Sequence, residues 1–142
     1  MIRVLIVEDQ RMAREDMENY IQSSGRYCLA ASITNAAMAE TVCRQSRCEL
    51  VLMDVCTEND ESGLVAAEKI KKTMPQIKVI IVTSLVECSF IDRARKAGVE
   101  SFWYKERCRQ RRTVGGYGSY DERGERVSGC SAGCDDRNGE KL

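Results

Sequence analysis

Residues 49–54 read ELVLMD, a short apolar run that ends in the carboxylate of Asp54. Runs of this length and composition are typical of strands that are buried on both faces of a parallel sheet. Three similar runs also end in polar side chains: residues 2–7 precede Glu8 and Asp9, residues 79–82 precede Thr83, and residues 101–104 precede Lys105. Ligands of open α/β sheets bind outside the carboxyl ends of the parallel strands. We therefore predict one pocket whose carboxylates, hydroxyl and ammonium group suit a divalent cation and a phosphoryl group.

The chain up to residue 104 alternates between strand-like and helix-like patterns. Strand-like runs predict five strands, at residues 2–7, 27–33, 49–53, 78–82 and 100–104. Apolar side chains at helical spacing predict four helices, at residues 10–24, 35–46, 62–74 and 87–97. Gly25 and Gly98 suit the C-terminal ends of the first and last helix, and Pro75 stops the third. This alternation predicts an α/β fold in which helices cover both faces of a doubly wound parallel sheet.

The composition of the chain excludes several classes of protein. Its 142 residues fit one domain, and 22 basic residues balance 22 acidic ones, so no bulk charge favours nucleic acid or a membrane. No apolar run approaches the roughly 20 residues of a spanning helix, and the N-terminus does not resemble a signal peptide. We therefore expect a cytoplasmic protein with reduced thiols at Cys28, Cys43, Cys48, Cys56 and Cys88. The absence of histidine excludes His-based zinc sites and catalytic triads.

Taken together and in order, these signals resemble the receiver domain of bacterial two-component response regulators. The resemblance covers residues 1–106 and rests on Glu8, Asp9, Asp54, Gly63, Thr83, Phe102 and Lys105. The sequences EDQ at residues 8–10 and FWYKE at residues 102–106 are most similar to receivers of transcriptional regulators that carry a C-terminal helix-turn-helix domain. The resemblance implies a flavodoxin-like, five-stranded parallel sheet in the order 2-1-3-4-5.

The resemblance also implies a role for each of these side chains. Asp54 accepts a phosphoryl group from a phosphohistidine, and Mg²⁺ neutralises the charge of the loose transition state. Asp9 and Asp54 bind the Mg²⁺ directly, Glu8 binds it through water, and the backbone carbonyl of Cys56 completes the oxygen ligands that this ion prefers. Lys105 and Thr83 bind phosphoryl oxygens, and Phe102 moves inward with Thr83 as the switch.

The partners implied by the resemblance are a sensor histidine kinase and a second receiver in a homodimer. Full-length relatives regulate transcription and bind DNA through a separate domain, whereas this chain itself is expected to bind neither nucleic acid nor a membrane. The implied activity is a signalling switch that takes part in its own phosphoryl transfer and hydrolysis, rather than a metabolic enzyme.

The composition changes abruptly after Arg107. Residues 107–142 hold seven of the ten glycines and few large aliphatic side chains, which is too little apolar surface to offset the entropy of ordering. We expect the receiver to end at about residue 106, without its last helix, and a disordered or out-of-frame tail without an output domain to follow. A truncated gene, a native disordered tail and a tail with its own function all remain open. A metal site at Cys108, Cys130 and Cys134 is disfavoured because no second cysteine pair or histidine completes it.

Two other functions remain as alternatives. A truncated receiver could act independently of phosphorylation, as a protein-binding module at most, or be non-functional. A small phosphohydrolase could also use Asp54 as its nucleophile, but such enzymes commonly carry a second aspartate two residues later, where this chain has Cys56.

Overall fold

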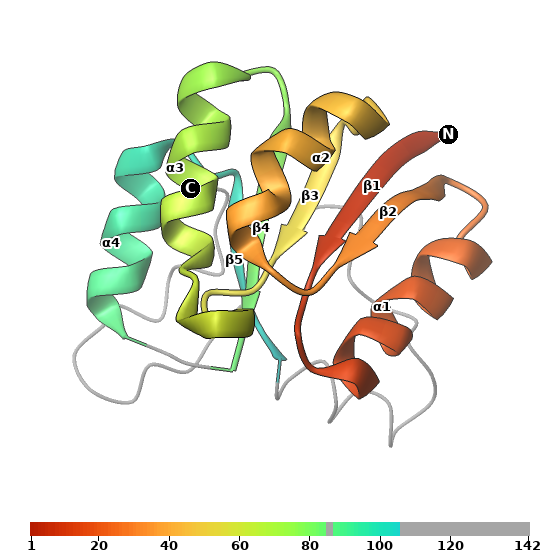
Figure 1. The fold of residues 1–142 in the computed structure, drawn as a ribbon, viewed down its shortest axis with the longest axis horizontal. Helices are drawn as coiled ribbons and strands as arrows, with labels where there is room; N and C mark the ends of the chain where they lie inside the picture. Colours follow the sequence, from red (N-terminus) through yellow and green to blue (C-terminus); the bar gives the residue numbers. More distant parts are fainter. Residues whose placement is uncertain (85–86, 106–142) are drawn as a thin grey trace.

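The computed structural model describes residues 1–84 and 87–105, whose strands and helices alternate along the chain as predicted (Figure 1). The strands are β1 (Ile2–Val7), β2 (Tyr27–Ile33), β3 (Leu50–Met53), β4 (Lys78–Thr83) and β5 (Ser101–Tyr104). The α-helices of these residues are α1 (Arg11–Ser23), α2 (Ala39–Ser46), α3 (Gly63–Thr73) and α4 (Cys88–Ala97). Two short 3-10 turns, η1 (Ala36–Met38) and η2 (Glu58–Asp60), precede α2 and α3.

The five strands form one parallel sheet in the order β2-β1-β3-β4-β5, so the predicted doubly wound order is confirmed. The register pairs Val7 of β1 with Met53 of β3, and Met53 with Ile81 of β4. The central strands therefore end at nearly the same level, with their arrowheads pointing downward in Figure 1. Residues that directly follow these strands are brought together at this carboxyl edge of the sheet.

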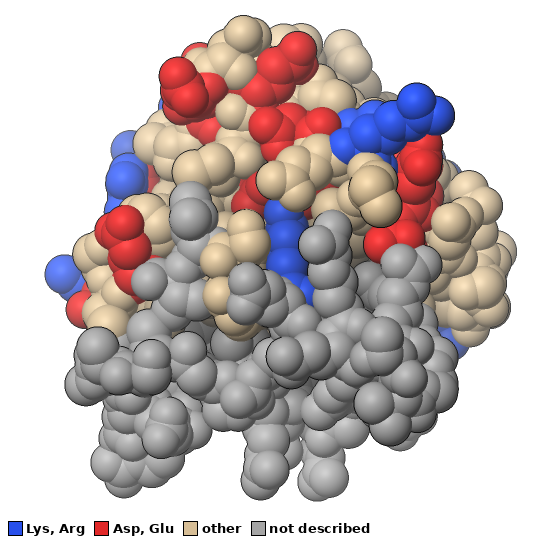
Figure 2. Space-filling model, turned by 90° about the horizontal axis from the view of Figure 1, so that it is seen from below, with Lys and Arg blue, Asp and Glu red and all other residues tan. Residues whose placement is uncertain are grey.

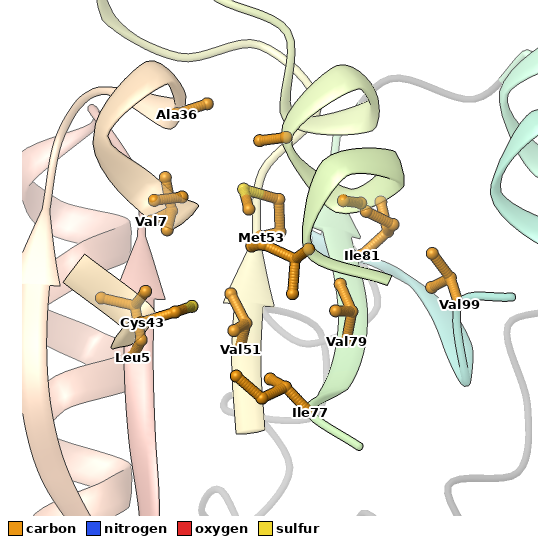
Figure 3. Packing of buried hydrophobic residues seen from close by; sticks show 14 of the residues in the cluster. Leu5, Val7, Ala36, Cys43, Val51, Met53, Ile77, Val79, Ile81 and Val99 are labelled. Atoms are coloured by element: carbon orange, nitrogen blue, oxygen red, sulfur yellow. The ribbon is translucent and has the colours of Figure 1, made fainter. Parts of the chain in front are cut away.

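The two faces of the sheet bury different side chains, because successive residues of a strand point to opposite sides. On one face, the core side chains pack beneath α2, α3 and α4; Figure 3 shows several of them, including Leu5, Val51, Val79 and Ile81. On the other face, Val4, Ile6, Leu52 and Val82 form a smaller cluster with Ile21, and Met17 and Tyr20 pack against it. Helix α1 therefore covers the face opposite to the other three helices.

Most predicted boundaries agree with the structure to within one or two residues, and one helix differs in kind. Residues 35–46 were expected to form a single helix capped by Asn35. The Asn35 side chain does accept a hydrogen bond from the Ala37 N–H (2.8 Å), but the turn it caps is η1, and α2 begins only at Ala39. A tighter first turn of this kind is common at helix N-termini.

Helix α2 ends in a left-handed turn at Arg47, which the sequence pattern did not predict. Arg47 adopts φ 51°, and its N–H and the Cys48 N–H (3.4 Å) both approach the carbonyl oxygen of Cys43. The second of these contacts is the one that defines a Schellman motif, in which the residue after the left-handed turn packs against the last helical turn. Cys43 and Cys48 are therefore neighbours in space.

Some predictions fall outside the described residues or are corrected within them. The predicted end of the receiver at residue 106, the missing last helix and the tail at residues 107–142 lie outside the described residues. Cys28, Cys43, Cys48 and Cys56 are free thiols as expected, whereas Cys88 is disulfide-bonded, so the prediction of a reduced thiol there is wrong. Sequence spacing does not show which cysteines folding brings together. In the described part of the chain, every helix is too short or too polar to cross a bilayer.

Candidate functional site

The chemically distinctive side chains meet at the carboxyl edge of the sheet. Glu8 and Asp9 follow β1, Asp54 follows β3, and Lys105 follows β5. The Nζ atom of Lys105 lies 2.9 Å from Oδ2 of Asp54 and also forms an ion pair with Glu8. Figure 2 looks onto this face of the molecule, where acidic side chains gather around a basic one. The predicted convergence of these four residues is therefore present.

Asp54 is held in one orientation by its surroundings. Asp54 is only 6% exposed. Its N–H donates to the carbonyl oxygen of Val7 (3.0 Å), and this hydrogen bond connects the end of β3 to the end of β1. Its carboxylate accepts one hydrogen bond from the Val55 N–H at Oδ1 (2.7 Å) and one from Lys105 at Oδ2. A buried carboxylate costs free energy unless it is paired, and these two donors provide that compensation.

Glu8 is fully buried beside Asp54. Its Oε1 atom accepts a hydrogen bond from the Gln10 N–H (3.0 Å), which fixes the side chain at the start of α1. Burial, followed by the negative charge of Asp54, raises the pKa of Glu8 from 4.5 to about 7, although the Lys105 ammonium opposes this shift. Two carboxylates so close together favour a proton or a cation between them.

Lys105 is the counter-ion of this acidic cluster. Its side chain is 12% exposed, and burial alone lowers the pKa of the ammonium group. The ion pairs with Glu8 and Asp54 outweigh burial, and the net effect raises the pKa of Lys105 above its ordinary value. The group is thus a permanent positive charge placed at the carboxylate of Asp54.

The acidic residues fit a hard divalent cation. Ligand oxygens of Glu8, Asp9 and Asp54 all lie within 4.8 Å of one another, and Asp9 is exposed to solvent while the other two are buried. Oxygen donors with one open side suit Mg²⁺, which keeps several of its waters. Cys56 lies in the loop after Asp54 and is bridged to Ser62. The role of its carbonyl as a further ligand stays a prediction.

Gly63 is required by the path of the backbone through the site. Its N–H donates to the carbonyl oxygen of Val55 (2.7 Å), so the start of α3 packs directly on the loop after β3. A β-carbon at this position would lie 1.7 Å from the carbonyl oxygen of Asp54. Only glycine fits a contact this close, which explains why residue 63 belongs to the site although it carries no side chain.

The predicted switch residues lie on β4, which is next to β3, and on β5, which is one strand further out. Thr83 is the last residue of β4 and is 1% exposed, and Phe102 on β5 is 3% exposed and belongs to the core beneath α3 and α4. The register pairs Phe102 with Ile81 and Thr83 with Tyr104. The structure therefore shows both side chains buried, and their movement on phosphorylation stays a prediction.

Comparison with known proteins decides what this site belongs to. The sequence profile of the family described as "Response regulator receiver domain" matches residues 4–112. The chain belongs to this family. Among curated proteins, it is 34% identical to the response regulator protein VraR of Staphylococcus aureus (strain Mu3) over 104 residues, which make up 73% of this chain and 49% of VraR. The receiver therefore spans about half the length of the curated relatives it matches.

Solved structures agree with this assignment. A DNA-binding response regulator of the LuxR family from Staphylococcus aureus superposes with a TM-score of 0.69 at 27% identity, over 75% of this chain and 88% of that chain. A CheY-like receiver domain protein from Methanospirillum hungatei shares the fold, with a TM-score of 0.64 at 21% identity over 81% of this chain and 99% of that chain. The expected similarity to receivers of transcriptional regulators is therefore confirmed.

Sequence reasoning missed two residues that support the acidic pocket of this receiver. Arg14 of α1 donates to the backbone carbonyls of Glu8 (3.0 Å) and Asp9 (3.4 Å), which fixes the loop after β1. Thr57 is buried; its hydroxyl accepts from the Ala36 N–H (2.9 Å) and donates to the Glu61 carbonyl (2.8 Å), which holds the loop after β3. Their partners are mainly backbone atoms, and no pattern of side chains in the sequence marks them.

Proposed function

We propose that this receiver accepts a phosphoryl group on Asp54 from the phosphohistidine of a sensor histidine kinase, in the presence of Mg²⁺, and thereby changes its protein contacts. The observation that carries the proposal is the pairing of a buried, oriented Asp54 carboxylate with the Lys105 ammonium, beside the oxygen ligands of Glu8 and Asp9. A nucleophile, a fixed positive charge and a cation site are the parts that phosphoryl transfer to a carboxylate needs.

The residues of the chain have separate tasks in this reaction. The Val55 N–H and Lys105 hold the Asp54 carboxylate, so that one of its oxygens can attack the phosphorus in line with the leaving imidazole. Glu8, Asp9 and Asp54 would hold Mg²⁺, which when bound supplies charge neutralisation for the equatorial oxygens. After transfer, the Lys105 ammonium exchanges its contact with the carboxylate for one with a phosphoryl oxygen. The backbone of Asp54, fixed to Val7 and packed against Gly63, keeps the acceptor in place throughout.

The negative charge of the phosphoryl group on Asp54 would also change the conformation of the domain. We assign the hydroxyl of Thr83 as a second partner of the phosphoryl oxygens, and Phe102 as the side chain that responds to its movement. Thr83 ends the strand next to β3, and Phe102 lies one strand further out, so a shift of the first can reach the second through β4 and β5. The altered surface then serves a partner, for which a second receiver is our first candidate.

The setting proposed for this domain follows from its relatives. The partner that phosphorylates it is a sensor histidine kinase, and the compartment is the cytoplasm, where such kinases present their phosphohistidine. The curated relatives are about twice as long as the part matched here, and one similar solved structure is that of a DNA-binding response regulator. We assign control of transcription to a separate DNA-binding domain of full-length proteins. We propose residues 1–106 as the phosphoacceptor domain.

Labelling with a small phosphodonor tests the proposal. Purified protein is incubated with acetyl phosphate and Mg²⁺, and intact mass spectrometry follows the gain of one phosphoryl group per chain. We expect labelling that requires Mg²⁺ and is lost in Asp54→Ala. Asp92→Asn, which changes an exposed carboxylate on α4, is the matched control and should label as the wild type does. Equal labelling of Asp54→Ala and wild type would overturn the assignment.

A further inference from the structure

A pair of cysteines lies at the end of the sheet opposite to the acidic pocket. Cys43 belongs to the last turns of α2, and Cys48 follows the left-handed residue Arg47 on the way to β3. The turn brings the Cys48 N–H to the Cys43 carbonyl oxygen (3.4 Å), and side chains at these two positions of a Schellman motif pack on each other. The thiols of Cys43 and Cys48 lie close enough for each to shift the pKa of the other. Both thiols are free.

Cys43 and Cys48 are among the residues that line a surface cavity of about 830 Å³ at the amino ends of the strands. Its lining also includes Arg44 and Arg47 on the α2 side and Ile2 and Lys78 at the starts of β1 and β4. Cys43 is 1% exposed, and Figure 3 shows it next to Leu5, whereas Cys48 is 5% exposed. Cys48 is therefore the more accessible of the two residues.

Basic side chains lie at this turn together with two acidic ones: Arg44 pairs with Glu40, and Glu49 accepts from the Arg3 N–H. The guanidinium group of Arg3 donates twice to the carbonyl oxygen of Ser46 (2.8 and 3.1 Å), which holds it beside the Cys48 residue. Contact with Cys43 lowers the pKa of the Cys48 thiol; burial opposes this effect, and Ser46 and Arg3 assist it. Contact with Cys48, together with burial, raises the pKa of Cys43. Two thiols in contact favour a state in which one is ionised while the other keeps its proton, and the Arg3 guanidinium lies beside this pair.

We propose that Cys43 and Cys48 are a thiol modification site, at which a hydroperoxide converts the two side chains into an intramolecular disulfide. Cys48 is the attacking sulfur and Cys43 the resolving one. The inference is independent of the phosphoryl chemistry at Asp54, because it rests on the turn after α2 and on the cavity.

The reaction balances with a hydroperoxide as the only oxidant. The Cys48 thiolate attacks the outer peroxide oxygen, an S–O bond forms, the O–O bond breaks, and the released hydroxide takes a proton to become water. The Cys43 sulfur then attacks the sulfur of the Cys48 sulfenic acid; an S–S bond forms, the S–O bond breaks, and the hydroxyl leaves with the Cys43 proton as a second water. Two thiols lose two electrons in total, and hydrogen peroxide gains them.

Peptide mapping of the folded chain tests the proposal. Trypsin cuts after Arg44 and Arg47, so a disulfide between the two cysteines joins peptide 27–44 to peptide 48–69. These peptides also contain Cys28 and Cys56, and the experiment therefore uses Cys28→Ser/Cys56→Ser protein alongside the wild type. Folded protein is treated with hydrogen peroxide, alkylated, digested without reductant and analysed by mass spectrometry. We expect the joined peptide pair in both proteins, lighter than the sum of its reduced parts by two hydrogen atoms.

A third protein separates the two roles. In Cys43→Ala, added to the same background, the joined pair should disappear, and a dimedone adduct should appear on Cys48 because the sulfenic acid is no longer resolved. Two results would overturn the proposal. One is full alkylation of both cysteines in wild-type protein after peroxide treatment; the other is Cys48 joined to a cysteine other than Cys43.

Discussion

Gly63 and Asp54 approach each other so closely that a β-carbon on residue 63 would lie 1.7 Å from the carbonyl oxygen of residue 54. Backbone atoms cannot move aside as a flexible side chain can, so Gly63→Ala must displace the loop that carries the acceptor. We expect a loss of about 1–3 kcal/mol in the free energy of unfolding, as for an overpacked core, and much slower labelling by acetyl phosphate.

Gly25→Ala is the matched control for this change. Gly25 adopts φ 67°, but a β-carbon there meets nothing within 4 Å. The substitution should cost about 1 kcal/mol of left-handed strain and leave labelling unchanged. Urea unfolding and labelling rates of both variants provide the measurement; equal labelling of Gly63→Ala and Gly25→Ala would refute the steric argument.

Lys105→Met removes the counter-ion of two buried carboxylates while keeping most of the length of the side chain. Glu8 and Asp54 then remain buried with fewer donors, and we expect the domain to lose roughly 1–3 kcal/mol at neutral pH in Mg²⁺-free buffer. Added Mg²⁺ should recover part of this loss, because the cation replaces the missing charge. Lys96→Met, at an exposed position of α4, should change neither quantity. Thermal melts of both variants with and without Mg²⁺ provide the measurement. Equal melting temperatures for Lys105→Met and Lys96→Met would show that the ion pairs of Lys105 do not stabilise the domain.

The raised pKa of Glu8 predicts a pH dependence of stability in the absence of Mg²⁺. Because its pKa is about 7 in the folded domain and 4.5 ordinarily, the folded domain binds this proton more tightly than the unfolded chain does. The stabilisation from Glu8 is therefore fully present below pH 4.5 and is lost as the pH rises through about 7. Glu8→Gln imitates the protonated form, so its unfolding free energy should fall less than that of the wild type across this window. Denaturant titrations at both ends of the window test this, and parallel slopes for the two proteins would contradict it.

The contacts of Lys71 are expected to stabilise the domain independently of the acidic pocket. Its ammonium, on a side chain only 9% exposed, donates to the carbonyls of Pro75 (3.0 Å) and Ile77 (2.9 Å) and to the carboxylate of Glu100 (2.7 Å). Lys71→Met removes this shared donor, and Glu100 keeps the Val79 N–H (2.7 Å) and Lys78 (3.7 Å) as partners. The substitution should cost about 1–3 kcal/mol, with labelling of Asp54 unaffected. Lys72→Met, one residue further and exposed, is the control. Chemical denaturation would reject this role if the two variants unfold at the same urea concentration.

The fold and the acidic pocket were largely predictable because each depends on a regular signal. Apolar runs gave the strands, and polar side chains directly after them had to meet once the sheet was parallel. The contributions of Arg14, Thr57 and Lys71 were not predictable, since they bind mainly backbone atoms. The break between η1 and α2 was also missed, because helical periodicity is similar on both sides of a 3-10 turn.

The contact between Lys105 and Asp54 joins residues that are 51 positions apart, from the edge of the described sheet to its centre. Such a contact forms only after β4 has inserted between β3 and β5, and long-range pairing of this kind comes late in folding. During synthesis, the carboxylates of the acidic pocket therefore lack their Lys105 counter-ion until β5 has been made. Lys105 follows β5, the last of the described strands to be made, so a nascent chain holds no finished acceptor site before this residue has been added.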